Sequence, residues 1–309
     1  MPRVKTGLCT DERFHAHAPP REHPERPERL VAIERALEAA GLHARTVPVA
    51  ARPATRAELE RVHARDYLET LEAEIDGAAG WLDPDTYFSP GSWTAALLAA
   101  GAVVELALRV HAGELASGAA FVRPPGHHAT RDRAMGFCLI NHVAVAAAAL
   151  RERGARPAIF DWDVHHGNGT EAIFAEDPDV LYASTHEWPQ YPGTGPADYR
   201  GRGRGLGATV NVPLPAGTDG ESYLAAYRAR IAPALEEFRP DVILLSAGFD
   251  AHRDDPLGGL ALTEETYAAV TRDLLRIQPR LVLVLEGGYD LGAIARSSVR
   301  VLKTMLGDA

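Results

Sequence analysis

The sequence predicts an α/β fold with a central, mostly parallel β-sheet flanked by helices on both faces. Short runs rich in β-branched residues alternate with longer Ala- and Leu-rich runs, which is typical of parallel strands joined by crossover helices. Several of the short runs are apolar throughout, so both faces of the sheet are expected to be covered. No linker-like segment divides the chain, and we expect one domain over 1–309.

The expected elements follow one another along the chain. A helix over about 25–40 ends at Gly41, because glycine readily adopts the left-handed conformation that closes a helix. Thr55 and Glu58 form a capping box, which indicates that another helix begins there. The segment 187–207, rich in Gly, Pro and Arg, is expected to be a long loop. The six expected strands are 119–123, 157–163, 180–186, 209–214, 241–248 and 280–286. The remaining expected helices are at about 93–111, 138–153, 219–237, 263–277 and 292–306.

Composition narrows the classes of function. The net charge of -10, from 42 acidic and 32 basic residues, argues against nucleic acid as a partner, because phosphate recognition needs clustered Lys and Arg. There is no unbroken apolar run of about 18 residues and no targeting pattern at 1–10, so we expect a cytoplasmic protein without a membrane partner. The two cysteines, Cys9 and Cys138, are expected to be reduced packing residues. The sequence leaves the oligomeric state open.

Four expected strands end in unusual clusters of polar residues. In doubly wound sheets, ligands bind beyond the carboxyl ends of the strands, so a functional site is expected there. The clusters read RPPGHH at 123–128, DWDVHHGN at 161–168, AGFDAH at 247–252 and EGGYD at 286–290.

The second and third clusters predict a metal site. In an extended segment side chains alternate, so Asp163 and His165 share a side with Asp161, whereas His166 points away. Asp250, at the end of the next strongly apolar strand, is the natural third ligand. Two carboxylates and an imidazole suit Zn²⁺, with Fe²⁺ or Co²⁺ as possible substitutes, and leave a position open for water and substrate. The alternative, capping and ion-pair residues at strand ends, is less favoured because buried charges without a partner ion are costly.

The other two clusters supply groups for hydrolysis. His127 and His128 follow a Pro-Pro-Gly turn, and an imidazole can take a proton from water and return it to a leaving amine. Asp161 and Asn168 are the expected partners that fix the tautomers of these histidines. Tyr289 follows two glycines, and its hydroxyl can bond the oxyanion formed when water attacks an amide carbonyl. The alternatives are histidines that act as structural hydrogen-bond partners and a tyrosine that anchors its loop.

The strings HPERPERL, RPPGHHA, GFCLINH, DWDVHHGNGT, AGFDAH and EGGYD together resemble the histone deacetylase and acetylpolyamine amidohydrolase family, in its class II and bacterial branch. The resemblance runs from about 23 to 290. It implies a single α/β domain with a central parallel sheet of the kind found in arginases, and a metal-dependent amidohydrolase. It also implies one zinc ion per chain, held by Asp163, His165 and Asp250.

The resemblance assigns roles to the other polar residues. It implies that His128 is the principal general base and acid, and that His127 is an electrostatic partner beside Asp161. Tyr289 matches the tyrosine that stabilises the transition state in this family. Asn168 stands where some members carry Asp, which would leave His128 less basic and the pH optimum open.

The resemblance also outlines a substrate channel for an acylated lysine peptide or a small acyl amine. Phe137 and Tyr191 resemble its two aromatic walls, with Gly136 beside them. Leu257 occupies a rim position where a polyamine-preferring relative carries Glu, which favours acyl-lysine or neutral acyl amides over acetylpolyamines. Asp85 is the residue that we expect to contact a peptide substrate's backbone.

Two further features come from the resemblance alone. Arg29 matches an arginine near the floor of the site, although the pattern is equally consistent with a surface helix. A structural potassium ion is implied near the zinc, bound by backbone oxygens and a serine hydroxyl. The residues concerned are Asp161, Asp163, His165 and Ser184.

Two other functions compete with this one. An arginase-like ureohydrolase would use two metals and needs a further carboxylate shortly after the histidine ligand, where this chain has Gly167. A non-catalytic protein that binds acyl ligands or acts as a scaffold is disfavoured, because metal ligands, histidines and tyrosine are all retained. The physiological substrate, the preferred acyl length and the native metal remain open.

Overall fold

A sheet of eight parallel strands runs through the chain, of which this computed structural model describes residues 5–308. The strand order is β2-β1-β5-β10-β9-β6-β7-β8, so that most neighbours in the sheet are distant in the sequence. The strands of the sheet are β1 (Gly7–Cys9), β2 (Val47–Pro48), β5 (Gly118–Ala120), β6 (Pro157–Asp161), β7 (Leu181–Glu187), β8 (Thr209–Leu214), β9 (Val242–Ala247) and β10 (Leu281–Leu285). A two-stranded antiparallel hairpin, β3 (Gly80–Trp81) and β4 (Tyr87–Phe88), stands apart from it.

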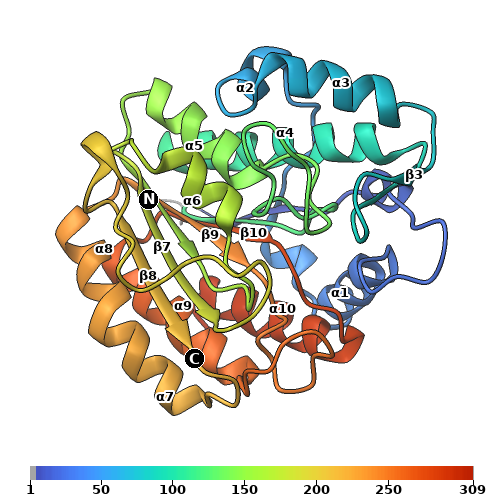
Figure 1. Cartoon of the computed structure of the whole chain (residues 1–309). Helices are drawn as coiled ribbons and strands as arrows, with labels where there is room; N and C mark the ends of the chain where they lie inside the picture. The colour runs from blue at the N-terminus through green and yellow to red at the C-terminus, as the bar shows by residue number, and fades with distance from the viewer. Residues whose placement is uncertain (1–4, 309) are drawn as a thin grey trace.

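Helices cover both faces of this sheet, which confirms the predicted fold class (Figure 1). α4 and α5 pack together on one face, whereas α9 and α10 pack together on the other, with α1 against α10. The helices are α1 (Glu28–Ala39), α2 (Arg56–Glu60), α3 (Arg65–Ile75), α4 (Ser92–His111), α5 (His142–Glu152), α6 (Asn168–Phe174), α7 (Gly220–Ala226), α8 (Ala232–Phe238), α9 (Glu264–Ile277) and α10 (Leu291–Met305). Short 3₁₀ turns lie at Glu12–Ala16, His43–Arg45 and Gly203–Gly205.

All six predicted strands are present, but four of them end earlier than expected, two of these by only one residue. The segment 157–163 is extended only as far as Asp161, where its last paired residue in β9 is Ser246. Beyond that point the chain leaves the sheet and bends at 163–165. β1 and β2 were missed, since segments of three and two residues are too short to show a hydrophobic period.

The predicted helix over 219–237 is interrupted. α7 and α8 are separated by a π-helical turn at Tyr227–Ile231. Pro233 in the first turn of α8 has no N–H to donate to the carbonyl four residues earlier, so the regular α-helical bonding cannot continue through it.

α4 alone among the described helices is long and apolar enough, by length and composition, to cross a membrane. In this fold 72% of its apolar window is buried. It packs against α5 and lies over β5 and β10, so its apolar composition is that of a core helix.

The predicted capping box at Thr55 is confirmed and gives a test of the local fold. Thr55 Oγ1 accepts from the Glu58 N–H at 3.2 Å, and Glu58 Oε2 accepts from the Thr55 N–H at 2.7 Å. Thr55→Ala removes the first bond and should lower the free energy of unfolding by about 1 kcal/mol, measured by chemical denaturation. Thr55→Ser keeps the hydroxyl and should match the wild type; equal losses in both variants would contradict the capping role.

Candidate active site

The four polar clusters meet because they follow four neighbouring strands. β5, β10, β9 and β6 are adjacent and parallel in the sheet, so their carboxyl ends lie along one edge. The loops after these strands carry, respectively, the two histidines, Tyr289, Asp250 and the Asp163–His165 pair. The sheet topology therefore brings together all the residues proposed for the chemistry.

Asp163, His165 and Asp250 form a compact group of possible metal ligands. Each offers one atom, and these atoms lie within 4.8 Å of one another. His165 Nδ1 lies 3.1 Å from Asp163 Oδ1 and 3.2 Å from Asp250 Oδ2. Asp250 Oδ1 accepts from the Val164 N–H at 2.9 Å, whereas Asp250 Oδ2 is buried and has no hydrogen-bond partner. A divalent cation would satisfy that oxygen, so the donor set fits a metal.

The electrostatics of this group also favour a cation. Burial and the nearby charge of Asp163 raise the pKa of the Asp250 carboxyl to about 7. Burial alone would lower the pKa of His165, but the nearby carboxylates of Asp163 and Asp250 raise it to about 10. Two carboxylates held close together in a buried place attract positive charge strongly.

Two glycines make room for the two carboxylates. A Cβ on Gly248 would lie 2.0 Å from Asp163 Oδ2, and a Cβ on Gly287 would lie 2.0 Å from Asp250 Oδ2. Gly248 and Gly287 are therefore required because the backbone passes very close to the carboxylates of these two possible metal ligands.

His127 and His128 stand beside this group and have different partners. His127 Nδ1 lies 3.0 Å from Asp161 Oδ2, and His128 Nδ1 lies 2.8 Å from Asn168 Oδ1. Burial alone would lower the pKa of His127, but the charges of Asp163 and Asp161 raise it well above its ordinary value. Burial, aided by the positive charge of His127, lowers the pKa of His128 well below its ordinary value. The pKa values of the two adjacent imidazoles are therefore shifted in opposite directions.

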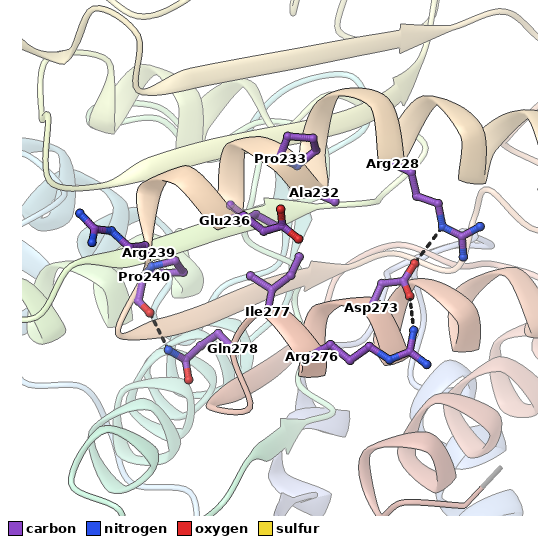
Figure 2. Close-up of a pocket in the computed structure, with 11 residues that line it drawn as sticks. Arg228, Ala232, Pro233, Glu236, Arg239, Pro240, Asp273, Arg276, Ile277 and Gln278 are labelled. Carbon is purple, nitrogen blue, oxygen red and sulfur yellow. Dashed lines mark hydrogen bonds and ion pairs between the residues drawn. The ribbon is translucent and has the colours of Figure 1, made fainter.

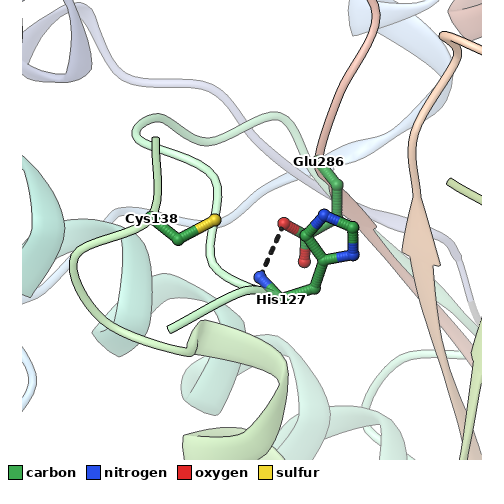
Figure 3. A group of neighbouring side chains, drawn as sticks. All are labelled: His127, Cys138 and Glu286. Carbon is green, nitrogen blue, oxygen red and sulfur yellow. Dashed lines mark hydrogen bonds between the residues drawn. The ribbon is translucent and has the colours of Figure 1, made fainter. Parts of the chain in front are cut away.

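Glu286 binds the backbone of the loop that carries His127 and His128, a role that the sequence did not indicate. Its Oε2 accepts from the N–H groups of Gly126 and His127 at 2.7 and 3.1 Å, and its Oε1 accepts from Ser246 Oγ at 3.2 Å. Figure 3 shows Glu286 beside His127 with Cys138 nearby. These three side chains also form a group with metal-ligand spacing, but both Glu286 oxygens already accept hydrogen bonds. We interpret the group as structural support for the loop.

Tyr289 lies at the end of a loop whose shape depends on glycine. Gly288 has φ +115°, a conformation that other residues rarely adopt. The Tyr289 ring is buried between the guanidinium of Arg29, 5.0 Å from its centroid, and the Phe137 ring, at 5.9 Å and 88°. Burial and the charge of Asp250 raise the pKa of Tyr289 well above its ordinary value, so its hydroxyl stays protonated.

Residues 23–305 match the sequence model of the histone deacetylase domain. The chain belongs to the histone deacetylase family. It is 43% identical to Histone deacetylase 5 of Arabidopsis thaliana, over 98% of this chain and 49% of that protein. It is 40% identical to Polyamine deacetylase HDAC10 of Homo sapiens, over 92% of this chain and 45% of that protein. The chain thus spans about half the length of these two relatives.

Solved structures give the same fold. The crystal structure of the HDA15 HD domain superposes with a TM-score of 0.96 at 41% identity, covering 99% of this chain and 89% of that chain. The recognition of the family from its motifs is therefore confirmed, together with the fold class.

The expected channel walls lie around the histidines in this histone deacetylase domain. The Tyr191 ring meets the His128 ring at 5.1 Å and 87°, and the Phe137 ring packs on the Tyr289 ring. Gly136, with φ +56°, leaves space for His128 and Tyr191: a Cβ there would lie 2.5 Å from His128 Cδ2 and 3.0 Å from the Tyr191 hydroxyl oxygen. Phe137 is itself in the left-handed region at φ 69°, and its N–H donates to Thr86 Oγ1 at 3.1 Å.

The expected rim residues occupy different surroundings. The Leu257 carbonyl accepts from Gln190 Nε2 at 3.5 Å, which ties this turn to the segment that carries Tyr191. Asp85 is half-buried, and its Oδ1 accepts from Thr86 Oγ1 at 3.2 Å. Burial and the neighbouring Asp83 raise the pKa of the Asp85 carboxyl. A contact of Leu257 or Asp85 with substrate stays a prediction.

Two further expectations concerned the position of Arg29 and a potassium site. Arg29 is fully buried and donates to the carbonyls of Gly288 and Glu286 at 2.6 and 2.5 Å, so its placement on a surface helix is excluded. Ser184 pairs with Asp161 in the register of β6 and β7, and its hydroxyl lies 2.9 Å from His186 Nδ1. Potassium binding by this pair stays a prediction.

A separate groove between α8 and α9 lies away from this site (Figure 2). It has a volume of about 600 Å³ and is lined at one end by Arg228, Asp273 and Arg276. The Asp273 carboxylate accepts from both arginines at 3.0 Å, so the two guanidinium groups at this end of the groove share one carboxylate. α8 and α9 end just before β9 and β10 begin. The groove therefore lies near the amino ends of these strands, whereas the candidate active site lies at their carboxyl ends.

The close approach at Gly248 can be tested by metal binding. Gly248→Ala places a methyl group against Asp163 and should weaken zinc affinity by roughly 10- to 100-fold, although all three ligands remain. Metal competition titration would measure this. Gly292→Ala in α10, whose new Cβ meets only the ends of the Arg296 and Asp290 side chains, is the control and should bind zinc like the wild type. Equal affinity in Gly248→Ala would contradict the proposed ligand geometry.

Proposed function

We propose that this chain is a zinc-dependent deacylase that hydrolyses the amide of an acyl-lysine or a related N-acyl amine with water. The observation that carries the proposal is the buried Asp163–His165–Asp250 group beside two histidines with opposite pKa shifts. Membership of the histone deacetylase family supports the same activity.

Asp163, His165 and Asp250 would hold one zinc ion, with Fe²⁺ or Co²⁺ as substitutes. A bound zinc ion supplies Lewis acidity toward water and an amide carbonyl. A count of one is supported by His166, which is directed to Thr194 and Glu171 at 2.8 and 3.2 Å instead of toward the ligands.

The two histidines would divide the proton chemistry. Neutral His128 donates its Nδ1–H to Asn168, so its Nε2 is free to take a proton from the attacking water and return it to the departing amine. His127 stays protonated beside Asp161 and stabilises negative charge. The different partners of the two rings thus give each a different task.

Tyr289 would donate its hydroxyl to the oxyanion that develops on the carbonyl oxygen. Phe137 and Tyr191 would line the acyl-lysine channel and exclude water from it, with Gly136 beside them. A structural potassium ion at Asp161 and Ser184 belongs to the same proposal.

An acetylpolyamine is the second candidate substrate, because one relative is a polyamine deacetylase. Leu257 offers no carboxylate at the rim for a second ammonium group, so acyl-lysine is the preferred substrate. A non-catalytic role in binding acyl ligands or as a scaffold is the alternative of another class.

The decisive experiment is to assay the zinc-loaded protein with acyl-lysine peptides, acetylpolyamines and small acyl amides. We expect release of the acyl acid, fastest from acyl-lysine, at one zinc per chain. Binding of acyl-lysine without release from any substrate would favour the non-catalytic alternative. Two metals per chain with urea release from arginine would instead support a ureohydrolase.

Two variants separate metal ligation from oxyanion stabilisation. Tyr289→Phe should retain zinc and lower turnover by roughly 10²-fold or more, the usual loss for one oxyanion donor. Asp250→Ala should lose zinc, because a ligand is removed. Zinc content and kcat measured on both variants would check this, and an unchanged kcat in Tyr289→Phe would refute the role of the tyrosine.

The pH dependence should follow His128. This histidine acts as a base only when neutral, that is, above its pKa, which lies well below the ordinary 6.5. The acidic limb of kcat/KM should therefore fall below pH 6.5. Asn168→Asp places a carboxylate against the ring, raises the pKa of His128 and should move that limb upward by roughly 1 pH unit or more. A limb that does not move would exclude His128 as the titrating base.

A further inference from the structure

The loop that carries Tyr289 is bound at nearly every peptide group. The Glu286 N–H donates to the Ala247 carbonyl, and the Gly287 carbonyl accepts from the Phe249 N–H, each at 3.1 Å. The Gly287 N–H donates to Asp163 Oδ2 at 2.8 Å. The loop is therefore joined directly to a proposed metal ligand and to the segment that begins at the end of β9.

Two buried charges of opposite sign bind the remaining groups. Arg29 holds the carbonyls of Glu286 and Gly288. The N–H groups of Tyr289 and Asp290 both donate to a single oxygen, Asp255 Oδ2, at 2.6 and 3.1 Å. A cation thus binds the carbonyls of the loop and an anion binds its N–H groups.

Asp255 holds a second functional segment with its other oxygen. Asp255 Oδ1 accepts from the Leu257 N–H at 3.0 Å. The side chain is buried, and its backbone N–H is bound to the His252 carbonyl at 2.9 Å. One carboxylate therefore fixes the tyrosine relative to the loop that follows Asp250.

We infer that Asp255 is a positioning residue for the proposed deacylation, holding the Tyr289 backbone so that the hydroxyl meets the oxyanion. The inference rests on the proposed function. A carboxylate suits the task because ionised acceptors make strong hydrogen bonds to N–H groups. It also lies at the N-terminal end of α10, where a negative charge is stabilised by the helix dipole.

Asp255→Asn is the informative substitution at this position. An amide has one accepting oxygen and one NH₂ group, whereas three backbone N–H groups converge on Asp255. In either orientation of the introduced amide, its NH₂ group faces a backbone N–H group. At least one of the three hydrogen bonds is therefore lost while the size of the side chain is kept. Asp254→Asn is the matched control, because Asp254 is partly exposed and pairs with Arg296 at 2.9 Å.

The experiment is a double-mutant cycle with Tyr289→Phe in the zinc-loaded protein. Asp255→Asn should lower kcat by roughly 10- to 100-fold, because small misplacements of a catalytic group cost that much, with KM and zinc content unchanged. In the Tyr289→Phe background the same change should cost no more than about 2-fold, since the hydroxyl that it positions is already absent. Asp254→Asn should leave kcat as in the wild type.

A full loss of kcat in both backgrounds would overturn the inference, because Asp255 would then act independently of the tyrosine. A loss of zinc in Asp255→Asn, or a wild-type kcat in that variant, would also overturn it.

Amide hydrogen exchange gives a readout that needs no activity. Peptides covering 286–291 should exchange faster in Asp255→Asn than in the wild type or in Asp254→Asn. Unchanged exchange would show that Asp255 does not hold this loop, even if the enzyme proved inactive. Absence of turnover in the wild type, with faster exchange in Asp255→Asn, would reject the proposed function but would still show that Asp255 holds the loop.

Discussion

Two buried carboxylates, Asp163 and Asp250, are held against the same imidazole nitrogen of His165, and the surrounding site follows from this arrangement. Like charges at this separation in a buried place repel strongly unless a positive charge lies between them. The protein nevertheless fixes both: Val164 donates to Asp250, and Gly287 donates to Asp163. This fixed repulsion supports the proposal that a divalent cation binds between the two carboxylates.

The same negative charge sets the two histidines apart. The charges of Asp163 and Asp161 raise the pKa of His127, whereas burial, together with the positive charge of His127, lowers the pKa of His128, whose ring centroid lies 4.0 Å from that of His127. Asn168, a neutral acceptor, orients His128 without restoring its basicity. The carboxylates of the candidate metal site thus also act on the pKa values of the two histidines.

Much of this site could be predicted from the sequence, because its residues follow apolar strands whose ends meet in a parallel sheet. The pairing of Asp161 with His127 and of Asn168 with His128 was predicted and is present. The expectation that Asp163 and His165 extend the strand was wrong, since the chain bends after Asp161. Their convergence comes from that bend and from hydrogen bonds to the neighbouring loops.

The contacts that support the site could not be predicted, because each joins segments far apart in the chain. In the sequence, Asp255 and Glu286 look like ordinary acidic residues of a turn and a strand end. Only the fold shows that their carboxylates accept hydrogen bonds from backbone N–H groups.

The buried ion network around Arg29 shows why such support is retained. Arg29 appears in the sequence as a helix residue of uncertain face, and its burial follows from the packing of α1 against α10. Glu25 accepts from Arg29 at 3.0 Å and from Arg123 Nη2 at 2.7 Å, and all three are fully buried. Buried ion pairs are weak sources of stability, because the desolvation of each charge offsets much of their attraction. Here, however, Arg29 binds the tyrosine loop, while Arg123 begins the segment that leads to His127. Glu25 therefore links the loop that carries Tyr289 to the segment that carries His127 and His128. The network is better explained by this geometry than by stability.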